Sequence, residues 1–249
     1  MPLILPAERY YHDDYNDLLR YFGPAFKLNW CSARDDKSSE DRAEGHYADN
    51  EDFDRRTHIY CYQSIGLMVQ GIHRPYIAKI LEHCGDMGPA SLIEIGSGGG
   101  QLGLAMHTLG FNVSFADLYG ESFKFLTWRL KDRRLERPVY LLDFGDFEIP
   151  KHDIAVCFDV MEHLDPDEQK RLVHRCADLG TNVFMNLIHD ERAFMDDVHF
   201  PLDTENLTDY IYNLYPSMWW ADYYPDDKGN FRQRLVIFGD GVSRSRKSE

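Results

Sequence analysis

Short apolar runs alternate with amphipathic segments along the chain from Ser91 onward. The runs are rich in aliphatic residues on consecutive positions, which is typical of strands that are buried on both faces. The predicted strands are 91–95, 112–117, 139–143, 153–159 and 182–188, and the helical candidates between them are 101–110, 121–134 and 166–178. Buried strands that are separated by helices indicate an α/β protein with a parallel, doubly wound sheet.

The C-terminal part adds a helix and an antiparallel pair of strands to this pattern. The segment "TENLTDYIYNLY" predicts a helix, and strand candidates follow at 217–224 and 231–238. The turn "PDDKGN" between these two runs favours a hairpin. The helix at 166–178 carries end signals, with Asp165 and Pro166 at its start and Gly180 just past its end. We therefore expect seven strands, mostly parallel, with a C-terminal antiparallel hairpin.

The first part of the chain has a different pattern. Residues 31–56 are polar and almost free of aliphatic side chains, which indicates a loop or a lid. An aromatic segment precedes this loop and a helical region follows it. We expect residues 1–88 to form a helical cap that recognises a substrate, residues 89–240 to form the α/β domain, and residues 241–249 to be a disordered tail.

Composition narrows the classes of function. Hydrophobic residues make up 43% of the 249 residues and charged residues 28%, as in ordinary globular proteins. The net charge of −15 disfavours nucleic acid, whose phosphates are neutralised by Lys and Arg. The five scattered cysteines indicate reduced thiols. No apolar stretch is long enough to span a bilayer and the start lacks a secretion signal, so we expect a cytoplasmic protein without membrane partners.

The segment "LIEIGSGGG" (92–100) joins the first predicted strand to a helix through a glycine loop. Such a loop brings bare backbone close to a ligand, because glycine has no side chain and tolerates positive φ. A dinucleotide motif, GxGxxG, matches Gly98, Gly100 and Gly103, but this match begins two residues too far beyond the strand. Counted from Gly96, the motif places Gln101 where its last glycine belongs. The loop alone is weak evidence for a dinucleotide.

The acid-x-Gly-x-Gly-x-Gly element formed by Glu94, Gly96, Gly98 and Gly100 resembles the first signature of the class I S-adenosylmethionine-dependent methyltransferases. The resemblance continues in "DIAVCFDVMEHLDP" and "DVHFPLDTENLTDYI" and extends over about residues 90 to 240. It implies a Rossmann-like seven-stranded sheet, the cofactor S-adenosyl-L-methionine and the product S-adenosyl-L-homocysteine. The N-terminal part is similar to no family that we recognise.

The resemblance also implies which residues bind the cofactor. The acid at the end of the second strand holds the ribose hydroxyls, the end of the third strand contacts adenine, and the acid after the first strand orders the loop or meets the ammonium group. A helix cap is the alternative role of Asp117, and Asp146 competes with Asp143. The implied residues are Glu94, Gly96, Ser97, Gly98, Gly100, Asp117, Leu118, Asp143, Phe144 and Asp159.

Asp159, Glu162 and His163 follow the fourth predicted strand, where side chains face the ligand crevice of an open α/β sheet. Three roles are open for this group. His163 has a side chain suited to general-base catalysis. The segment is also similar to one that binds a metal in O-methyltransferases of ubiquinone biosynthesis, although this chain offers no second clear set of Mg²⁺ ligands. Otherwise, Glu162 and His163 only order the turn. We predict no metal site.

Further candidates flank this crevice. His199, after the fifth strand, is a second candidate base, and His189 is a candidate substrate ligand. Tyr10 and Tyr11 are candidates for stacking on an acceptor, ahead of Trp219 and Trp220.

We expect an enzyme that methylates oxygen or nitrogen of a small molecule of secondary-metabolite, sugar or quinone type. The alternatives are methylation of a protein side chain and a catalytically inactive protein that binds the cofactor.

Overall fold

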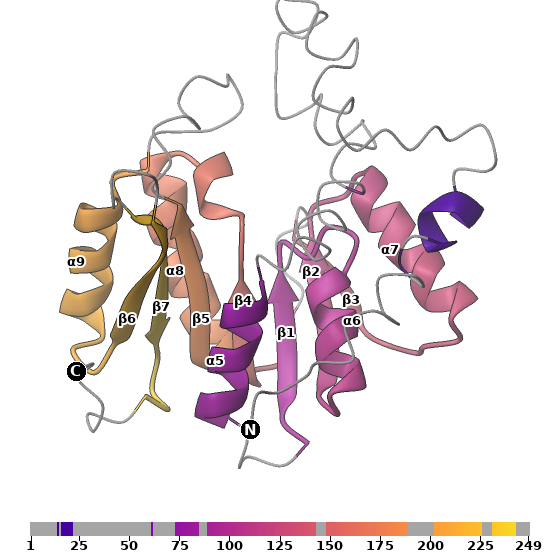
Figure 1. Ribbon diagram of the computed structural model, residues 1–249, viewed down its shortest axis with the longest axis horizontal. Coiled ribbons are helices and arrows are strands. Elements are labelled where there is room, and N and C mark those ends of the chain that lie inside the picture. The colour runs from indigo at the N-terminus through magenta and orange to yellow at the C-terminus, as the bar shows by residue number, and fades with distance from the viewer. Residues whose placement is uncertain are drawn as a thin grey trace, which may run out of the picture.

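A seven-stranded sheet forms the centre of the computed structural model, which describes residues 14, 16–21, 61, 73–84, 89–142, 148–188, 202–225 and 231–242 (Figure 1). The strand order is β3-β2-β1-β4-β5-β7-β6. The strands are β1 (Ser91–Ile95), β2 (Asn112–Asp117), β3 (Val139–Leu141), β4 (His152–Cys157), β5 (Gly180–Ile188), β6 (Trp219–Pro225) and β7 (Phe231–Phe238). The first five strands are parallel, whereas β7 is antiparallel to both β5 and β6.

Helices cover both faces of the sheet. They are α5 (Arg74–Cys84), α6 (Gln101–Thr108), α7 (Glu121–Asp132), the short 3-10 helix η1 (Met161–His163), α8 (Pro166–Leu179) and α9 (Thr204–Leu214). Side chains of α5, α6 and α7 share one apolar cluster with one face of the strands. Side chains of α8 and α9 share the second cluster with the other face. The fold is therefore a three-layer sandwich with two cores.

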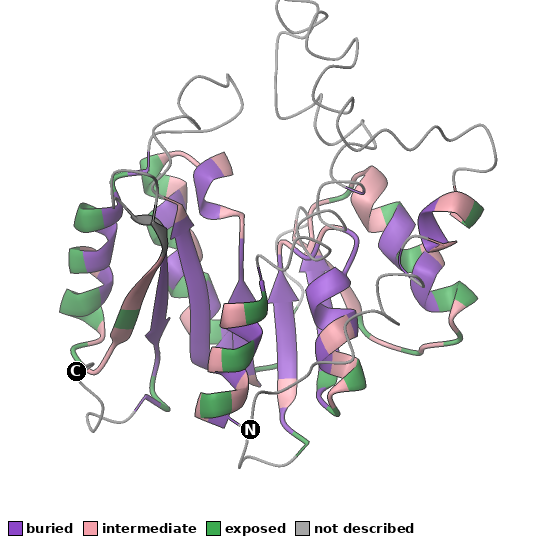
Figure 2. Cartoon of the chain, viewed as in Figure 1, coloured by how far each residue is buried: buried purple, intermediate pink, exposed green. Residues whose placement is uncertain are grey.

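The central strands are buried along almost their whole length, while the helices have both buried and exposed residues (Figure 2). In β1, for example, every residue from Leu92 to Ile95 is buried. This burial explains the consecutive apolar positions in the sequence, since a strand covered on both faces has no solvent side.

The strand order reverses its direction between β1 and β4. From β1 the chain first builds outward to β2 and β3, and then returns to place β4 on the other side of β1. Ligands of open α/β sheets bind outside the carboxyl ends of the strands at such a switch point. The loops after β1 and β4 are therefore where a site is expected.

The structure confirms the predicted fold class, including the mostly parallel sheet and the C-terminal antiparallel strand pair. From Ser91 onward, the ends of the predicted strands and helices agree with the observed ones to within two residues. Asp165 caps α8, and Gly180 ends this helix and begins β5. No helix in the described part of the chain is both long and apolar enough to cross a membrane. The predicted lid, 31–56, lies outside the described residues.

Candidate functional site

The loop after β1 depends on three glycines in left-handed backbone conformations. The φ angles are +69° at Gly96, +52° at Gly98 and +74° at Gly100, where other L-residues are strained. Space is also limited, because a Cβ atom on Gly96 would collide with the side chain of Val160 in the β4–α8 connection. The glycine loop and the end of β4 are thus in direct contact across the switch point.

Glu94 organises the start of α6. Its carboxylate Oε2 accepts a hydrogen bond from the backbone N–H of Gly103 at 2.9 Å. The N-cap residue of α6 is Gly100, which has no side chain that can cap the helix, so Glu94 supplies an acceptor from the strand. Burial raises the pKa of Glu94 to about 8. Of its two predicted roles, the contact supports ordering of the loop.

Asp117, at the end of β2, lies against the same loop. Its Oδ2 accepts a hydrogen bond from Gly98 N–H at 2.5 Å, and its Oδ1 accepts one from Leu118 N–H at 2.7 Å. The N-cap of α7 is Gly120, whose helix end has no side-chain cap, so the alternative role of Asp117 as the cap of this helix is wrong. A carboxylate oxygen can accept more than one hydrogen bond, so these contacts leave Asp117 able to bind a ligand as well.

Asp159, two residues beyond the end of β4, is held by two side chains from other parts of the chain. Its Oδ1 accepts a hydrogen bond from Asn186 Nδ2 at 2.6 Å, and its Oδ2 lies 2.7 Å from His73 Nε2. Asn186 also accepts the backbone N–H of Asp159 at 2.7 Å, which helps to hold the residue at a φ of +57°. A non-glycine residue at such a φ is uncommon and costs free energy, so its persistence points to a functional constraint.

The charge of Asp159 results from opposing effects. Burial favours the neutral acid, but the nearby His73 and the hydrogen bond from Asn186 outweigh it and lower the pKa of Asp159 below its ordinary value. Burial, together with the neighbouring Asp159 carboxylate, raises the pKa of Glu162 to about 8. At neutral pH the pair therefore comprises a carboxylate and a protonated acid.

Glu162 and His163 lie on η1, a few residues after Asp159. Glu162 is 5% exposed, and its Oε2 has no hydrogen-bond partner among the described residues. Gln169 of α8 donates hydrogen bonds to the backbone carbonyls of Met161 and Leu164 and so holds the short helix in place. His163, the last residue of η1, is partly exposed. Buried polar atoms without partners are rare in proteins, so this oxygen of Glu162 is a candidate ligand contact.

The three loops at the switch point, 96–100, 117–120 and 158–164, contain neither Lys nor Arg, and the last two contain acids. The Ser97 hydroxyl and the Gln101 amide nitrogen are also buried without partners in the described structure. This set suits a ligand with hydroxyl groups and positive charge better than a pyrophosphate, which needs donors or cations. S-Adenosylmethionine has a ribose, a sulfonium and an ammonium group, and it fits these residues.

Several predicted residues cannot be placed. Tyr10, Tyr11, Asp143, Phe144, His189 and His199 lie outside the described residues. Glu94, the loop glycines, Ser97, Asp117, Leu118, Asp159 and His163 gather at the carboxyl ends of β1, β2 and β4. The described residues contain no group of three or more His, Cys, Asp or Glu side chains that is arranged to hold a metal ion.

Sequence reasoning missed His73 and Asn186. His73 precedes α5, and its Nδ1 is buried without a described partner. Asn186 is a fully buried amide within the apolar run of β5, and a polar residue in such a run is a signal that points to a buried partner. The sequence contains no comparable signal for His73.

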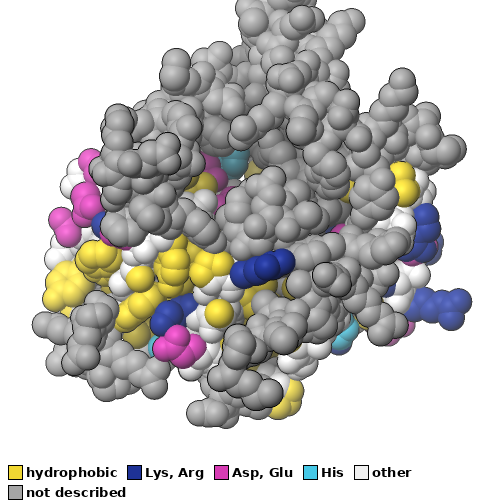
Figure 3. All heavy atoms as spheres, viewed as in Figure 1, with side chains coloured by type: hydrophobic (Ala, Val, Ile, Leu, Met, Phe, Trp, Pro, Cys, Tyr) yellow, Lys and Arg dark blue, Asp and Glu magenta, His cyan; other side chains and the backbone are white. Residues whose placement is uncertain are grey.

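Trp219 and Trp220 lie on β6, at the far edge of the sheet from the switch point. Lys79 Nζ lies 4.5 Å from the ring centroid of Trp219, and the Arg234 guanidinium lies 4.3 Å from that of Trp220. In the space-filling view, hydrophobic side chains gather near β6 and α9 (Figure 3). The tryptophans thus contribute to this edge of the sheet and not to the crevice.

No protein-family model matches the chain. A ubiquinone biosynthesis O-methyltransferase from Rickettsia typhi is 23% identical over 122 residues, which cover 48% of this chain and 50% of that protein. The chain thus matches about half the length of this curated relative.

Solved structures show the same fold. One is the magnesium protoporphyrin IX methyltransferase (ChlM) of Synechocystis with bound SAM, with a TM-score of 0.54 and 13% identity over 90% of each chain. Another is the methyltransferase domain of a bacterial CtHen1 protein, with a TM-score of 0.52 and 16% identity over 66% of this chain and 96% of that one.

Proposed function

We propose that this chain, a member of the class I S-adenosylmethionine-dependent methyltransferase family, transfers the methyl group of S-adenosyl-L-methionine to oxygen or nitrogen of a small molecule. The observation that carries the proposal is the set of carboxylates and left-handed glycines at the carboxyl ends of β1, β2 and β4. The Synechocystis enzyme of the same fold is crystallised with this cofactor.

The described contacts support the proposed mode of cofactor binding. In the proposal, Asp117 binds the ribose hydroxyls while Gly98 and Leu118 keep its carboxylate aimed at the loop. The backbone from Gly96 to Gly100 surrounds the methionine part, with the Ser97 hydroxyl as an additional donor. Asp143 and Phe144 remain the proposed adenine contacts on the basis of their family resemblance.

The cofactor supplies a methyl group that its sulfonium already activates. The protein then has to align the acceptor with this methyl group and, for a hydroxyl acceptor, remove a proton. His163 and His199 are the candidate bases from sequence. His73 is a third candidate, because Asp159 binds its Nε2 at 2.7 Å and its buried Nδ1 has no described partner. A carboxylate in this position orients an imidazole and stabilises its protonated form.

The proposed acceptor is a small molecule for two reasons. The net charge of −15 and the acidic loops repel a phosphate backbone. The chain also resembles part of the Rickettsia typhi ubiquinone biosynthesis O-methyltransferase. Secondary metabolites, sugars and quinones are acceptors of this kind. Protein methylation is the alternative function.

Radiolabelled S-adenosylmethionine supplied with a metabolite extract, a protein extract or total RNA tests the proposed function. We expect label to appear in small, extractable products that depend on the protein. Label in the protein or RNA fraction alone would contradict the small-molecule acceptor. Cofactor binding without turnover in any fraction would indicate an inactive binding protein.

Once an acceptor is found, single alanine variants of the three histidines identify the base. We expect replacement of the base to lower kcat by about 10²–10⁴-fold with little change in cofactor affinity. The rate of the wild-type enzyme should rise with pH through the pKa of this histidine, and the base variant should lack that rise. Unchanged kcat in all three variants would show that none of them removes the proton, as expected for an amine that arrives deprotonated.

A further inference from the structure

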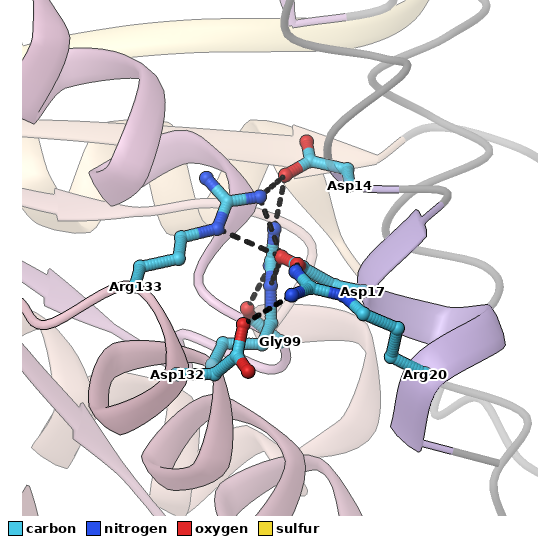
Figure 4. Close-up of polar contacts among 7 residues, drawn as sticks. Asp14, Asp17, Arg20, Gly99, Asp132 and Arg133 are labelled. Carbon is cyan, nitrogen blue, oxygen red and sulfur yellow. Dashed lines mark hydrogen bonds and ion pairs between the residues drawn. The ribbon is translucent and has the colours of Figure 1, made fainter. Parts of the chain in front are cut away.

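Six charged side chains join the N-terminal helical segment 16–21 and the preceding Asp14 to α7 (Figure 4). The N-terminal side contributes Asp14, Asp17 and Arg20, and the α7 side contributes Arg129, Asp132 and Arg133. Three aspartates and three arginines balance in charge. In Figure 1 the N-terminal helix lies beside α7, which itself follows β2.

Arg129 is the centre of this cluster. Its side chain is fully buried, with 0% exposure. Its Nε donates to Asp17 Oδ2 at 2.9 Å, and its Nη2 donates to Asp14 Oδ1. A buried guanidinium without anionic partners is strongly unfavourable, so these two carboxylates are what allow Arg129 to remain inside.

The remaining side of the guanidinium reaches the cofactor loop. Arg129 Nη1 donates a hydrogen bond to the backbone carbonyl of Gly99. The N–H of the same peptide unit, which belongs to Gly100, donates to the carbonyl of Ser97 at 2.7 Å. Both polar groups of the Gly99–Gly100 peptide therefore have partners, and its plane is fixed from two sides. Glycine backbone has little intrinsic preference of its own, so these contacts decide its orientation.

We propose that Arg129 is a positioning residue which, held by Asp14 and Asp17, fixes the glycine loop in the conformation that binds the cofactor. The N-terminal segment is then part of the support of the cofactor site, although it lies outside the sheet. This inference rests on the proposed cofactor, S-adenosylmethionine, and does not depend on the acceptor.

The coupling follows from the contacts. If the segment with Asp14 and Asp17 leaves α7, Arg129 loses both of these carboxylate partners. Its unpaired charge is then more stable in solvent than in the interior. Movement to solvent breaks its bond to the Gly99 carbonyl and frees the peptide plane. Cofactor binding and docking of the segment thus favour each other, and linkage requires the effect to be reciprocal.

The first test measures binding of S-adenosylhomocysteine by calorimetry to the double variant Asp14→Asn, Asp17→Asn. We expect at least about tenfold weaker binding than in the wild type. Arg20→Gln is the matched control, because Arg20 also joins Asp17 to α7 but ends on Asp132 and not on the loop. Its side chain is 53% exposed, and we expect its affinity to stay within about twofold of the wild-type value.

The second test uses the wild-type protein and does not depend on a variant folding. Hydrogen exchange of the backbone amides in 16–21 is measured with and without S-adenosylhomocysteine. We expect saturating ligand to slow exchange in this segment, a reciprocal effect that a purely structural ion-pair cluster would not produce.

The outcomes separate the two proposals. If the wild-type protein does not bind S-adenosylhomocysteine, both the proposed function and this inference fail. If it binds the ligand while exchange in 16–21 is unchanged, the inference fails and the proposed function stands. The inference also fails, and the proposed function again stands, if the folded double variant binds as tightly as the wild type.

Discussion

Four acidic side chains lie at the carboxyl ends of β1, β2 and β4, and each has a different environment. Asp117 accepts two backbone N–H groups, and Glu94 is buried and accepts one. Asp159 is held in a charged form by His73 and Asn186, whereas burial keeps Glu162 protonated near neutral pH. Residues of one chemical type thus provide loop support, proposed ligand contacts and candidate catalytic groups, depending on their surroundings.

Asp117→Ala is expected to weaken binding of S-adenosylhomocysteine. The change removes the proposed ribose contact and also releases the N–H of Gly98. Loss of charged hydrogen bonds of this kind costs about 2–3 kcal/mol, or about 30–150-fold in affinity. Calorimetry on the folded variant measures the effect.

Asp153→Ala is the control for this variant. Asp153 accepts hydrogen bonds from Ser91 N–H and Oγ at the opposite end of β1 and β4. We expect this variant to lose stability without losing affinity. An Asp117→Ala protein that binds as tightly as the wild type would remove Asp117 from the ribose site.

The raised pKa of Glu94, about 8, predicts a pH dependence of stability. Because the folded state holds this proton more tightly than the unfolded state, the stabilising effect is complete below about pH 4.5 and is lost as pH rises towards 8. Between pH 6 and 8 one such group contributes a loss of at most about 2.7 kcal/mol in the free energy of unfolding.

Glu94→Gln should reduce this decline, because the amide has no proton to lose. Urea unfolding at pH 6 and pH 8 measures the free energy of unfolding of the wild type and of Glu94→Gln. Glu148→Gln, at an exposed position, is the control. If the wild type and Glu94→Gln lose the same free energy between these pH values, Glu94 does not hold its proton in the folded protein.

At the scale of elements, close packing determines how α6 approaches the sheet. A Cβ atom on Gly103, within this helix, would lie 2.6 Å from Glu94 Oε2 and would overlap the ring of Phe115. α6 therefore rests on β1 and β2 through a position without a side chain. The α8 start is different: Asp165 and Glu168 form a reciprocal capping box that fixes where the chain leaves the β4 loop.

Gly103→Ala tests this packing through the sign of its effect. Helix propensity alone predicts that alanine stabilises the helix by about 1 kcal/mol. We expect the opposite, a loss of about 1–3 kcal/mol in the free energy of unfolding, because the new methyl group has no space. Chemical denaturation of the wild type and of Gly103→Ala measures the sign of the change in the free energy of unfolding. A stabilised variant would show that α6 can move away from Phe115 at no cost.

At the scale of the whole molecule, the sheet brings the ends of β1, β2 and β4 to one edge, and helices bury both of its faces. The acids at this edge add to the net charge of −15. The N-terminal cluster contacts the same edge, because Arg129 donates a hydrogen bond to the Gly99 carbonyl. Binding of a ligand there should stabilise the entire domain, since the contacts come from strands that form its core.

S-Adenosylhomocysteine should therefore raise the melting temperature, whereas NAD⁺ should not. At 100 times its Kd, a ligand that binds only the folded state adds about 2.7 kcal/mol to the free energy of unfolding. NAD⁺ tests the rival dinucleotide interpretation of the glycine loop, because its pyrophosphate would meet loops without Lys or Arg. Thermal unfolding with each ligand provides the comparison. Stabilisation by NAD⁺ alone would show that the glycine loop binds a dinucleotide and not S-adenosylmethionine.

Local sequence was sufficient for the fold class and for the position of the glycine loop. The apolar runs are consecutive because their strands are buried on both faces, and Gly96, Gly98 and Gly100 mark backbone that other residues cannot adopt without strain. Asp117 and Asp159 were identifiable because each ends a strand run, and the ends of parallel strands meet at one edge of the sheet.

Only the tertiary structure joined His73 to Asp159 and Arg129 to Asp14, which are 86 and 115 residues apart in the chain. The periodicity of a helix shows which face is buried, but it does not identify the partner of a buried charge. Arg129 is one of the buried residues of α7, beside the apolar Phe125, Leu126 and Leu130. Its carboxylate partners and its contact with Gly99 depend on how the N-terminal segment packs. The free energy of that packing includes the cost of removing charges from water and their attraction in the interior, and both depend on residues far apart in the sequence.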